Sequence, residues 1–371
     1  MPPSPKEAAR SERLVALIRR EVEREAGWLS FSRYMELALY APGLGYYSAG
    51  AFDVDFITGP EISPLFARTL ARQVAQILGE SNGDILEFGA GSGKLAFDLL
   101  HELHALGMSP QRYFIVEVSP ALAARQREVL APLAPRVEWL EKLPKRFSGV
   151  IVANEVLDAM PVHLVAWHKD GIYERGVGFE GEGFVWNDRK LDEGALFGAA
   201  KDIDAPHGFV SEIGLAARAF VSTLAPILER GVVLLVDYGF AEREYYHPQR
   251  SAGTLMCHYS NQAHDDPFHL PGLQDITSHI DFSAVSNASV ASGLELLGYT
   301  TQANFLINCG ITDLLAQTPA ADALNYLPLS KAAQKLLSPS EMGELFKVIA
   351  LGKGIESPLI GFRSGDKSRL L

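Results

Sequence analysis

The sequence predicts an α/β fold in which a mostly parallel β-sheet has helices on both faces. Short, almost uninterrupted apolar runs alternate along the chain with longer segments of helical periodicity, as in sheets whose strands are buried on both faces. The first of these runs is followed directly by a glycine-rich turn and a helix. With 371 residues, the chain can also hold insertions or a smaller lobe beside such a core.

The expected strands are five short apolar runs, at 85–88, 112–118, 137–139, 150–153 and 231–237. Three segments of helical periodicity separate them, at 94–106, 120–130 and 209–228. Farther along the chain we expect a helix at 287–297 and two more strands, at 300–307 and 346–350. This alternation is typical of a Rossmann-like sheet.

Two further segments are expected outside this alternation. Helical spacing ahead of the sheet predicts helices at 11–25, 31–40 and 63–78. The segment 45–60 is rich in glycine and in aromatic residues such as Tyr46, Tyr47 and Phe52, so we interpret it as a cover rather than a solvent loop. Between the fourth and fifth strands, residues 162–186 alternate and turn at glycines, which is the pattern of antiparallel hairpins.

We therefore expect four regions. Residues 1–80 would form an N-terminal helical cover, and 161–204 an inserted antiparallel β lobe. The sheet domain would consist of 81–160 and 205–355, followed by a C-terminal tail at 356–371.

Composition and charge exclude several classes of protein. A formal net charge of −12 disfavours nucleic-acid binding, which needs a basic surface. Cys257 and Cys309 are far apart, and the histidines after residue 241 lack the spacing of zinc ligands, so no metal site is expected. No apolar run approaches the roughly 20 residues of a membrane-spanning helix. Since residues 1–27 also do not resemble a targeting peptide, we expect a cytoplasmic protein that is not inserted in a membrane.

A ligand site is expected at the glycine turn. Gly89, Gly91 and Gly93 follow the first strand, so the backbone there can approach a ligand without an intervening Cβ. Glu117 ends the second strand, where a carboxylate can accept both hydroxyls of an adenosine ribose. One alternative is a tight turn that binds nothing, with Glu117 as a solvated acid. Another is a nicotinamide cofactor, which could use the same carboxylate.

The form of the turn distinguishes between these cofactors. Its three alternating glycines, preceded by Glu87, are similar to the first motif of class I methyltransferases. In that motif the glycines make room for the aminoacyl part of S-adenosyl-L-methionine (SAM). The resemblance implies SAM as the cofactor and gives Glu87 a role in ordering the turn. A buried acid that only caps neighbouring amides is the alternative for Glu87.

Five segments resemble the MidA-like methyltransferases: 34–47, 55–63, 117–120, 154–163 and 236–239. That family includes the mitochondrial complex I assembly factor that symmetrically dimethylates an arginine of a complex I core subunit. The resemblance extends from about residue 31 to about residue 351 and implies a class I methyltransferase sheet. Two positions depart from the pattern. Gly59 stands where serine is expected, and Asn154 stands where the mitochondrial member has histidine.

The resemblance also implies cofactor contacts outside the glycine turn. Thr58, Pro60 and Glu61 are expected at the methionine end of SAM, with Glu61 on its ammonium group. Glu61 would equally suit the first turn of a helix. Val118 and Asn154 are the other residues expected to bind the cofactor.

An arginine acceptor would require carboxylates. A guanidinium has a pKa above about 12, so an acid that orients it is needed rather than a base that deprotonates it. Glu155 and Asp158 follow the fourth strand, at the edge where open α/β sheets bind ligands, and are the predicted catalytic residues. Alternatively, Asn154 and Asp158 only cap the next turn. Asp237 and Tyr238, at the end of the fifth strand, are expected to line the substrate side.

Three functions fit these patterns: a protein arginine methyltransferase, a small-molecule methyltransferase on the same core, and a catalytically silent assembly factor that keeps the cofactor fold. The family resemblance favours the first. It implies a protein substrate, with a respiratory-complex subunit as one candidate, and a homodimer is a candidate assembly. The intact glycines and Glu117 argue against a silent scaffold.

Overall fold

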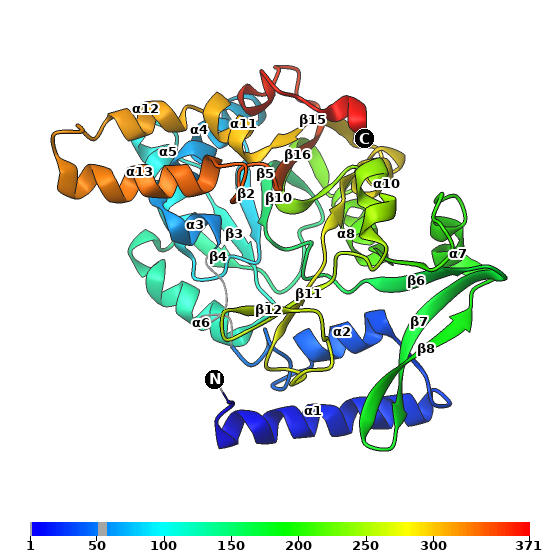
Figure 1. The fold of residues 1–371 in the computed structure, drawn as a ribbon. Coiled ribbons are helices and arrows are strands. Elements are labelled where there is room, and N and C mark those ends of the chain that lie inside the picture. The colour runs from blue at the N-terminus through cyan, green and yellow to red at the C-terminus, as the bar shows by residue number, and fades with distance from the viewer. Residues whose placement is uncertain (1, 51–57) are drawn as a thin grey trace. The chain divides into compact units, whose positions relative to one another are not determined.

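The main β-sheet of the protein has the strand order β15-β16-β10-β5-β2-β3-β4 (Figure 1). The computed structural model describes residues 2–50 and 58–371. The strands along this path are β2 (Asp84–Phe88), β3 (Tyr113–Val116), β4 (Val137–Trp139), β5 (Phe147–Asn154), β10 (Leu228–Phe240), β15 (Glu295–Thr301) and β16 (Phe346–Lys353). From β10 to β4 all neighbours pair in parallel, whereas β16 is antiparallel to both β10 and β15. The predicted mostly parallel α/β sheet is therefore confirmed.

The described residues divide into two units. The sheet unit consists of residues 58–157, 220–239 and 282–371 and contains the main sheet. The lobe unit consists of residues 2–50, 158–219 and 240–281 and contains two antiparallel sheets. No helix among the residues that the structure describes is long and apolar enough to cross a membrane.

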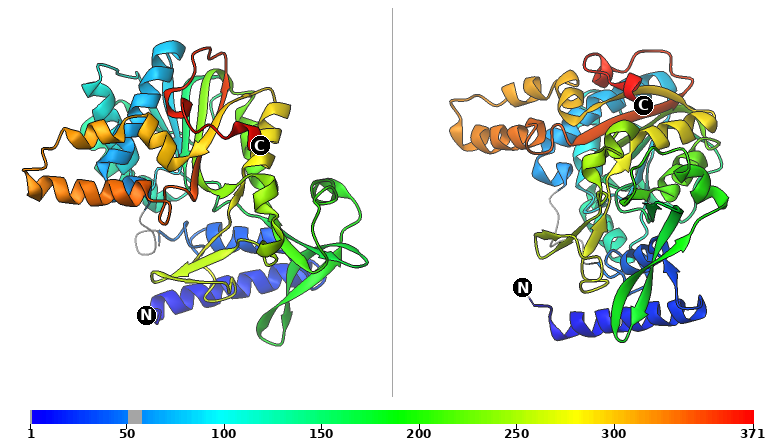
Figure 2. Two further views of the ribbon diagram at one scale, coloured as in Figure 1. Left: turned by 45° about the horizontal axis from the view of Figure 1, so that its top comes forward. Right: turned by 45° about the vertical axis from the view of Figure 1, so that its right-hand side comes forward.

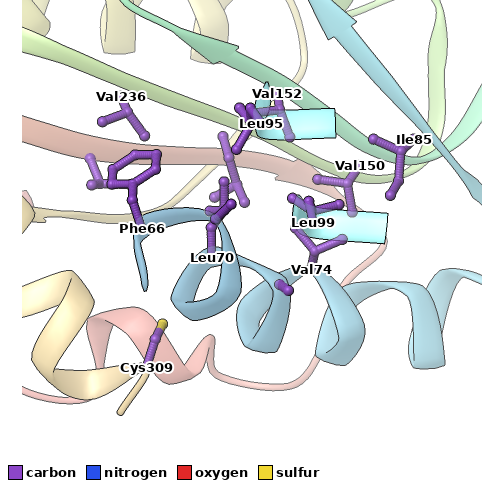
Figure 3. Close-up of a cluster of buried hydrophobic side chains, with 14 of the residues drawn as sticks. Phe66, Leu70, Val74, Ile85, Leu95, Leu99, Val150, Val152, Val236 and Cys309 are labelled. Atoms are coloured by element: carbon purple, nitrogen blue, oxygen red, sulfur yellow. The ribbon is translucent and has the colours of Figure 1, made fainter. Parts of the chain in front are cut away.

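Helices α4 (Pro64–Ser81) and α5 (Lys94–Ala105) cover one face of the main sheet (Figures 1 and 2). Figure 3 shows their apolar side chains, among them Phe66, Leu70 and Leu99, against Val150 and Val152 of β5. Successive side chains of a strand point to opposite faces. Ile151 must therefore face away from α4, and it too is fully buried, which explains why the strands are apolar throughout.

Helix α10 (Phe282–Ala291) lies on the opposite face of the sheet. Its Phe282 contacts Tyr299 of β15, which pairs with Ile349 of β16 on the face opposite Val348 and the α4 cluster. The other helical elements of this unit are α3 (Gly59–Ile62), α6 (Pro120–Val129), η2 (Ala131–Leu133), α11 (Gln302–Asn308), α12 (Ile311–Ala316), α13 (Ala323–Leu337), η4 (Ile360–Phe362) and η5 (Ser368–Leu370). The expected helices on both faces of the sheet are thus present.

The lobe unit is built on the sheet β1-β7-β6-β9, with β8 paired to β7. All of its pairs are antiparallel, and β6 to β8 form the predicted hairpins. Helices α1 (Pro5–Arg24) and α2 (Phe31–Tyr40) pack against β7. A second small sheet has the order β12-β11-β13.

The strands of the lobe unit are β1 (Leu29–Ser30), β6 (His163–His168), β7 (Gly171–Glu180), β8 (Gly183–Lys190), β9 (Phe209–Ile213), β11 (Met256–Tyr259), β12 (Gln262–His264), β13 (Asp275–Thr277) and β14 (Ile280–Asp281). Its short helices are α7 (Gly194–Ala200), α9 (Glu242–Tyr245) and η3 (Pro248–Arg250). The boundary between the lobe unit and the sheet unit falls within α8 (Leu215–Leu224).

The boundaries of the sheet unit and the lobe unit differ from those of the four expected regions, and burial explains the difference. Residues 63–80 were expected in an N-terminal cover, but α4 belongs to the core of the sheet unit. The expected C-terminal tail contributes Phe362 to the same core. Residues 240–281 group with the lobe instead, because Cys257 and Ile276 are buried among α1 and α2 side chains. Each segment therefore belongs to the unit in which its apolar side chains are buried.

Two predicted elements were wrong in their type. The expected strand at 300–307 is mostly helix, because β15 ends at Thr301, whose side chain accepts a hydrogen bond from the Asn304 N–H and caps α11. The expected helix at 209–228 begins as a strand, since residues 209–213 pair with β6 before α8 starts. Of the expected cover at 45–60, residues 51–57, which include Phe52, lie outside the described part of the chain.

Candidate active site

The main sheet has a topological switch point between β2 and β5. From β2 the chain continues outward to β3 and β4, whereas β5 and β10 lie on the other side of β2. In open α/β sheets the crevice at the carboxyl ends of two such strands is where ligands bind. The glycine turn follows β2 and Asn154 ends β5, so the order of the strands brings two of the predicted site segments together.

The glycine turn has the backbone that only glycine adopts easily. Gly89, Gly91 and Gly93 have φ angles of +63°, +54° and +88°, in the left-handed region. A Cβ added to Gly89 would lie 2.9 Å from Cγ2 of Val156, which shows how closely the turn approaches the segment after β5. The turn therefore leaves backbone, rather than side chains, at the switch point.

Glu117 directly follows β3 and is half-buried. Its Oε1 accepts a hydrogen bond from the Ser119 N–H at 2.9 Å, and its Oε2 accepts one from Gln126 Nε2 at 2.9 Å. Burial raises the pKa of Glu117, and these hydrogen bonds oppose the rise. A carboxylate has about four acceptor positions, so beside the donors from Ser119, Gln126 and Val118 the Glu117 carboxylate can still accept a hydrogen bond from a ribose hydroxyl. The next residue, Val118, is 70% exposed and offers an apolar surface beside this carboxylate.

Glu87 lies beneath the glycine turn rather than at the surface. It is 2% exposed and accepts a hydrogen bond from the Tyr113 hydroxyl at 2.8 Å. Burial raises its pKa to about 8, although the bond from Tyr113 opposes that rise. The side chain therefore joins β2 to β3 below the site, which agrees with an ordering role and not with direct exposure to a ligand.

This pKa predicts a pH dependence of stability. The folded-state value of about 8 exceeds the ordinary 4.5, so the folded protein holds this proton more tightly than the unfolded chain. The stabilisation of the folded protein by this Glu87 proton is fully present below pH 4.5 and is lost as the pH rises towards 8. We expect Glu87→Gln to remove it, so that the cofactor-free wild type loses stability relative to the variant across this range. Urea unfolding of both proteins at several pH values measures the difference, and parallel curves would contradict the assignment.

Helix α3 links the turn to the segment after β5. Glu61 accepts a hydrogen bond from the Ser92 hydroxyl within the glycine turn. The N–H of Gly59 donates to Oε1 of Glu155 at 3.3 Å. Thr58 is the N-cap residue of α3, and Pro60 is buried within the helix. The predicted residues Thr58, Pro60 and Glu61 are thus held next to the glycine turn, and Glu61 is an exposed first-turn acid.

The departure at Gly59 has a packing explanation. A Cβ at this position would lie 3.1 Å from the ring of Phe66, closer than an ordinary van der Waals contact. Glycine therefore lets α3 pack against α4 without displacing that ring.

The predicted catalytic carboxylates fall in different units. Glu155 belongs to the sheet unit, has a φ angle of +52°, and accepts a hydrogen bond from Asn154 Nδ2 at 3.0 Å in addition to the one from Gly59. Asp158 belongs to the lobe unit, where it is 5% exposed and its carbonyl accepts a hydrogen bond from the Ser278 N–H at 3.0 Å.

Asp237 does not stand at a strand end, because β10 continues to Phe240. Its carboxylate is fully buried and accepts hydrogen bonds from the N–H groups of Leu157 and Tyr238, both at 2.9 Å. The expectation that Asp237 lines the substrate side is therefore replaced by a structural role, in which it fixes the backbone after β5. The aromatic Tyr47 likewise donates to Asp275 within the lobe unit, with both oxygens at 3.0 Å.

Sequence reasoning missed Gln126 and Ser92, which contact Glu117 and Glu61. A signal for Gln126 was present, because it shares the buried stripe of α6 with Leu122 and Ala123. A polar residue on an apolar stripe usually has buried partners. Ser92 had no such signal, since its partner is 31 residues away in the sequence.

Comparisons with known proteins identify the family of this chain. A family model described as “Putative S-adenosyl-L-methionine-dependent methyltransferase” matches residues 65–300. A crystal structure of a Burkholderia thailandensis protein bound to S-adenosyl-homocysteine (SAH) is similar, with 52% identity, 100% coverage of both chains and a TM-score of 0.97. A native crystal structure from the same organism has 53% identity, the same coverage and a TM-score of 0.95.

Among curated proteins, “Protein arginine methyltransferase NDUFAF7, mitochondrial” of Danio rerio is 29% identical over 369 residues, which cover 88% of this chain and 83% of that protein. The protein of the same name from Homo sapiens is 26% identical, with 88% and 81% coverage. Because the family model spans most of the chain and the Burkholderia structures align along its whole length, the chain belongs to this family of SAM-dependent methyltransferases, and S-adenosyl-L-methionine is its cofactor.

Proposed function

We propose that this methyltransferase transfers methyl groups from SAM to an arginine side chain of a protein. The observation that carries the proposal is the similarity of 88% of the chain to proteins named as protein arginine methyltransferases. The resemblance to the MidA-like family makes a subunit of a respiratory complex the candidate substrate. A cytoplasmic location and a homodimer stay predictions.

In this proposal the cofactor-binding residues all come from the sheet unit. Glu117 accepts a hydrogen bond from a ribose hydroxyl, and Val118 packs against the base. Gly89, Gly91 and Gly93 give the aminoacyl part room beside the backbone, and Glu87 orders their turn from below. Glu61, with Thr58, Pro60 and Asn154 nearby, holds the ammonium and carboxylate end of the cofactor.

The chemistry requires alignment more than proton transfer. SAM supplies an electrophilic methyl group on a positively charged sulfur, and the acceptor nitrogen must approach in line with the bond that breaks. A guanidinium has a pKa above about 12 and stays charged in proteins, so Glu155 would pair with it and fix its plane. Hydrogen bonds from Gly59 and Asn154 hold Oε1 of this carboxylate in place. Asp158 is the second candidate for the acceptor side.

Labelled SAM tests the proposal directly. We expect that incubating the protein with methyl-labelled SAM and an extract of its host will transfer label to a protein, and that hydrolysis of that protein will yield methylated arginine. Label found only in small molecules would replace protein arginine with a metabolite as acceptor. If SAH binds in calorimetry but no label is transferred to any acceptor, the protein is a silent binder and the proposal fails.

A further inference from the structure

The geometry points to Gln126 as a positioning residue that fixes the ribose carboxylate Glu117 and the glycine turn relative to each other. The inference rests on the proposed role of Glu117 in the cofactor site. Gln126 itself would not touch the cofactor, because it is fully buried in α6. It would act through the Glu117 carboxylate and the glycine turn, which would contact the cofactor.

The amide of Gln126 joins three segments of the sheet unit. Its Nε2 donates to the carbonyl of Gly91 at 3.0 Å and to Oε2 of Glu117 at 2.9 Å. Its Oε1 accepts a hydrogen bond from Trp139 Nε1 at 2.9 Å. The glycine turn after β2, the end of β3 and strand β4 therefore meet at one side chain.

The orientation of this amide follows from the chemistry of its partners. The indole N–H of Trp139 can only donate, so the atom facing it must be the amide oxygen. The amide nitrogen then faces Gly91 and Glu117, which both offer acceptors, and its two N–H groups are matched by two oxygens. The guanidinium of Arg127 lies 4.9 Å from the centre of the Trp139 ring and restrains the indole in turn.

Burying the amide of a glutamine costs desolvation free energy, which its hydrogen bonds must offset. The other buried positions of α6 near it are Leu122 and Ala123, and a methionine would fill the same space without an amide to desolvate. Two of the three hydrogen bonds of Gln126 end on residues of the candidate cofactor site. Without the bond from Gln126, Glu117 would lose its side-chain donor and keep only the backbone N–H groups of Ser119 and Val118.

A double-mutant cycle with SAH binding, measured by calorimetry on the full chain, tests the inference. We expect Gln126→Met to weaken SAH binding about tenfold or more in the wild-type background, the scale of a hydrogen bond to a charged group. In the Glu117→Ala background, the same substitution should weaken binding by a clearly smaller factor, because the carboxylate that it positions is already gone and only its bond to the Gly91 carbonyl remains to be lost. Trp139→Phe, which removes the donor to Oε1 and keeps a smaller aromatic ring beside Arg127, should have a smaller effect with the same dependence on Glu117.

Gln73 provides the matched control. It is an equally buried glutamine of the same unit, and its amide bonds to Gln76 and to the N–H of Gly361 within the packing of α4. Gln73→Met should lower the unfolding temperature without changing SAH affinity, which separates a loss of stability from a loss of positioning.

Three results would overturn the inference. They are wild-type affinity in Gln126→Met, an equal loss of affinity in both backgrounds, and a comparable loss in Gln73→Met. If Gln126→Met does not fold, the Trp139→Phe cycle decides by the same criteria. Failure of the wild type itself to bind SAH would refute the cofactor site instead, so the two failures are distinguishable.

Discussion

Replacing Gly91 by valine is expected to abolish SAH binding while the protein stays folded. Gly91 has a φ angle of +54°, where a β-branched residue is strained, so the turn would have to change its backbone. The same change would displace the Gly91 carbonyl, which accepts the hydrogen bond from Gln126. A branched side chain would also occupy the space through which the backbone approaches the cofactor. Calorimetric titration of the variant with SAH measures the loss.

Gly107 is the control for backbone strain alone. It has a φ angle of +74° in the exposed turn after α5, and a Cβ there would meet nothing within 4 Å. Gly107→Val should therefore lower stability through the same kind of backbone strain but bind SAH with wild-type affinity. Retained affinity in Gly91→Val would argue against the glycine turn as the cofactor site, and a loss in both variants would mean that strain, not the site, is responsible.

Glu155→Gln is expected to lower methyl transfer by roughly 10²-fold or more, as when a pre-organised charged group is removed from an active site. The glutamine keeps a carbonyl oxygen that can accept from Gly59, so α3 should stay attached. Only the negative charge that would pair with a guanidinium is lost. SAH affinity should therefore barely change, and the effect should appear in the turnover of the native acceptor.

Two companion variants make this result specific. Glu155→Ala also removes the acceptor for the Gly59 N–H, so it should weaken cofactor binding as well as turnover. Glu117→Gln is the same chemical change after β3, and it should act mainly on SAH affinity. If Glu155→Gln loses the cofactor, or methylates the native acceptor at the wild-type rate, Glu155 does not serve the acceptor and its role is to hold α3.

Much of the candidate site follows from local sequence, for a physical reason. A glycine turn needs only the residues of the turn itself, and Glu117 is placed by the end of the strand that precedes it. Parallel strands buried on both faces must be apolar throughout, so β2, β3 and β5 are visible as runs in the sequence. These features depend on neighbours within a few residues.

Other features depend on partners that are distant in the sequence. Residues 209–213 form a strand because β6 supplies their hydrogen bonds, and the chain there could equally continue a helix. Asp237 was expected at a strand end, but pairing with β16 extends β10 past it, and its carboxylate then serves the backbone after β5.

The sequence by itself thus determined the fold class, the position of the glycine turn and the carboxylate after the second strand, because each is set by local backbone preference and by periodic burial. Only the tertiary structure decided that Gln126 joins Glu117 to the turn and that α3 reaches both Ser92 and Glu155. Those contacts connect residues that lie far apart in the sequence or on different strands. Their hydrogen bonds exist only after the sheet has brought the ends of β2, β3 and β5 to one edge.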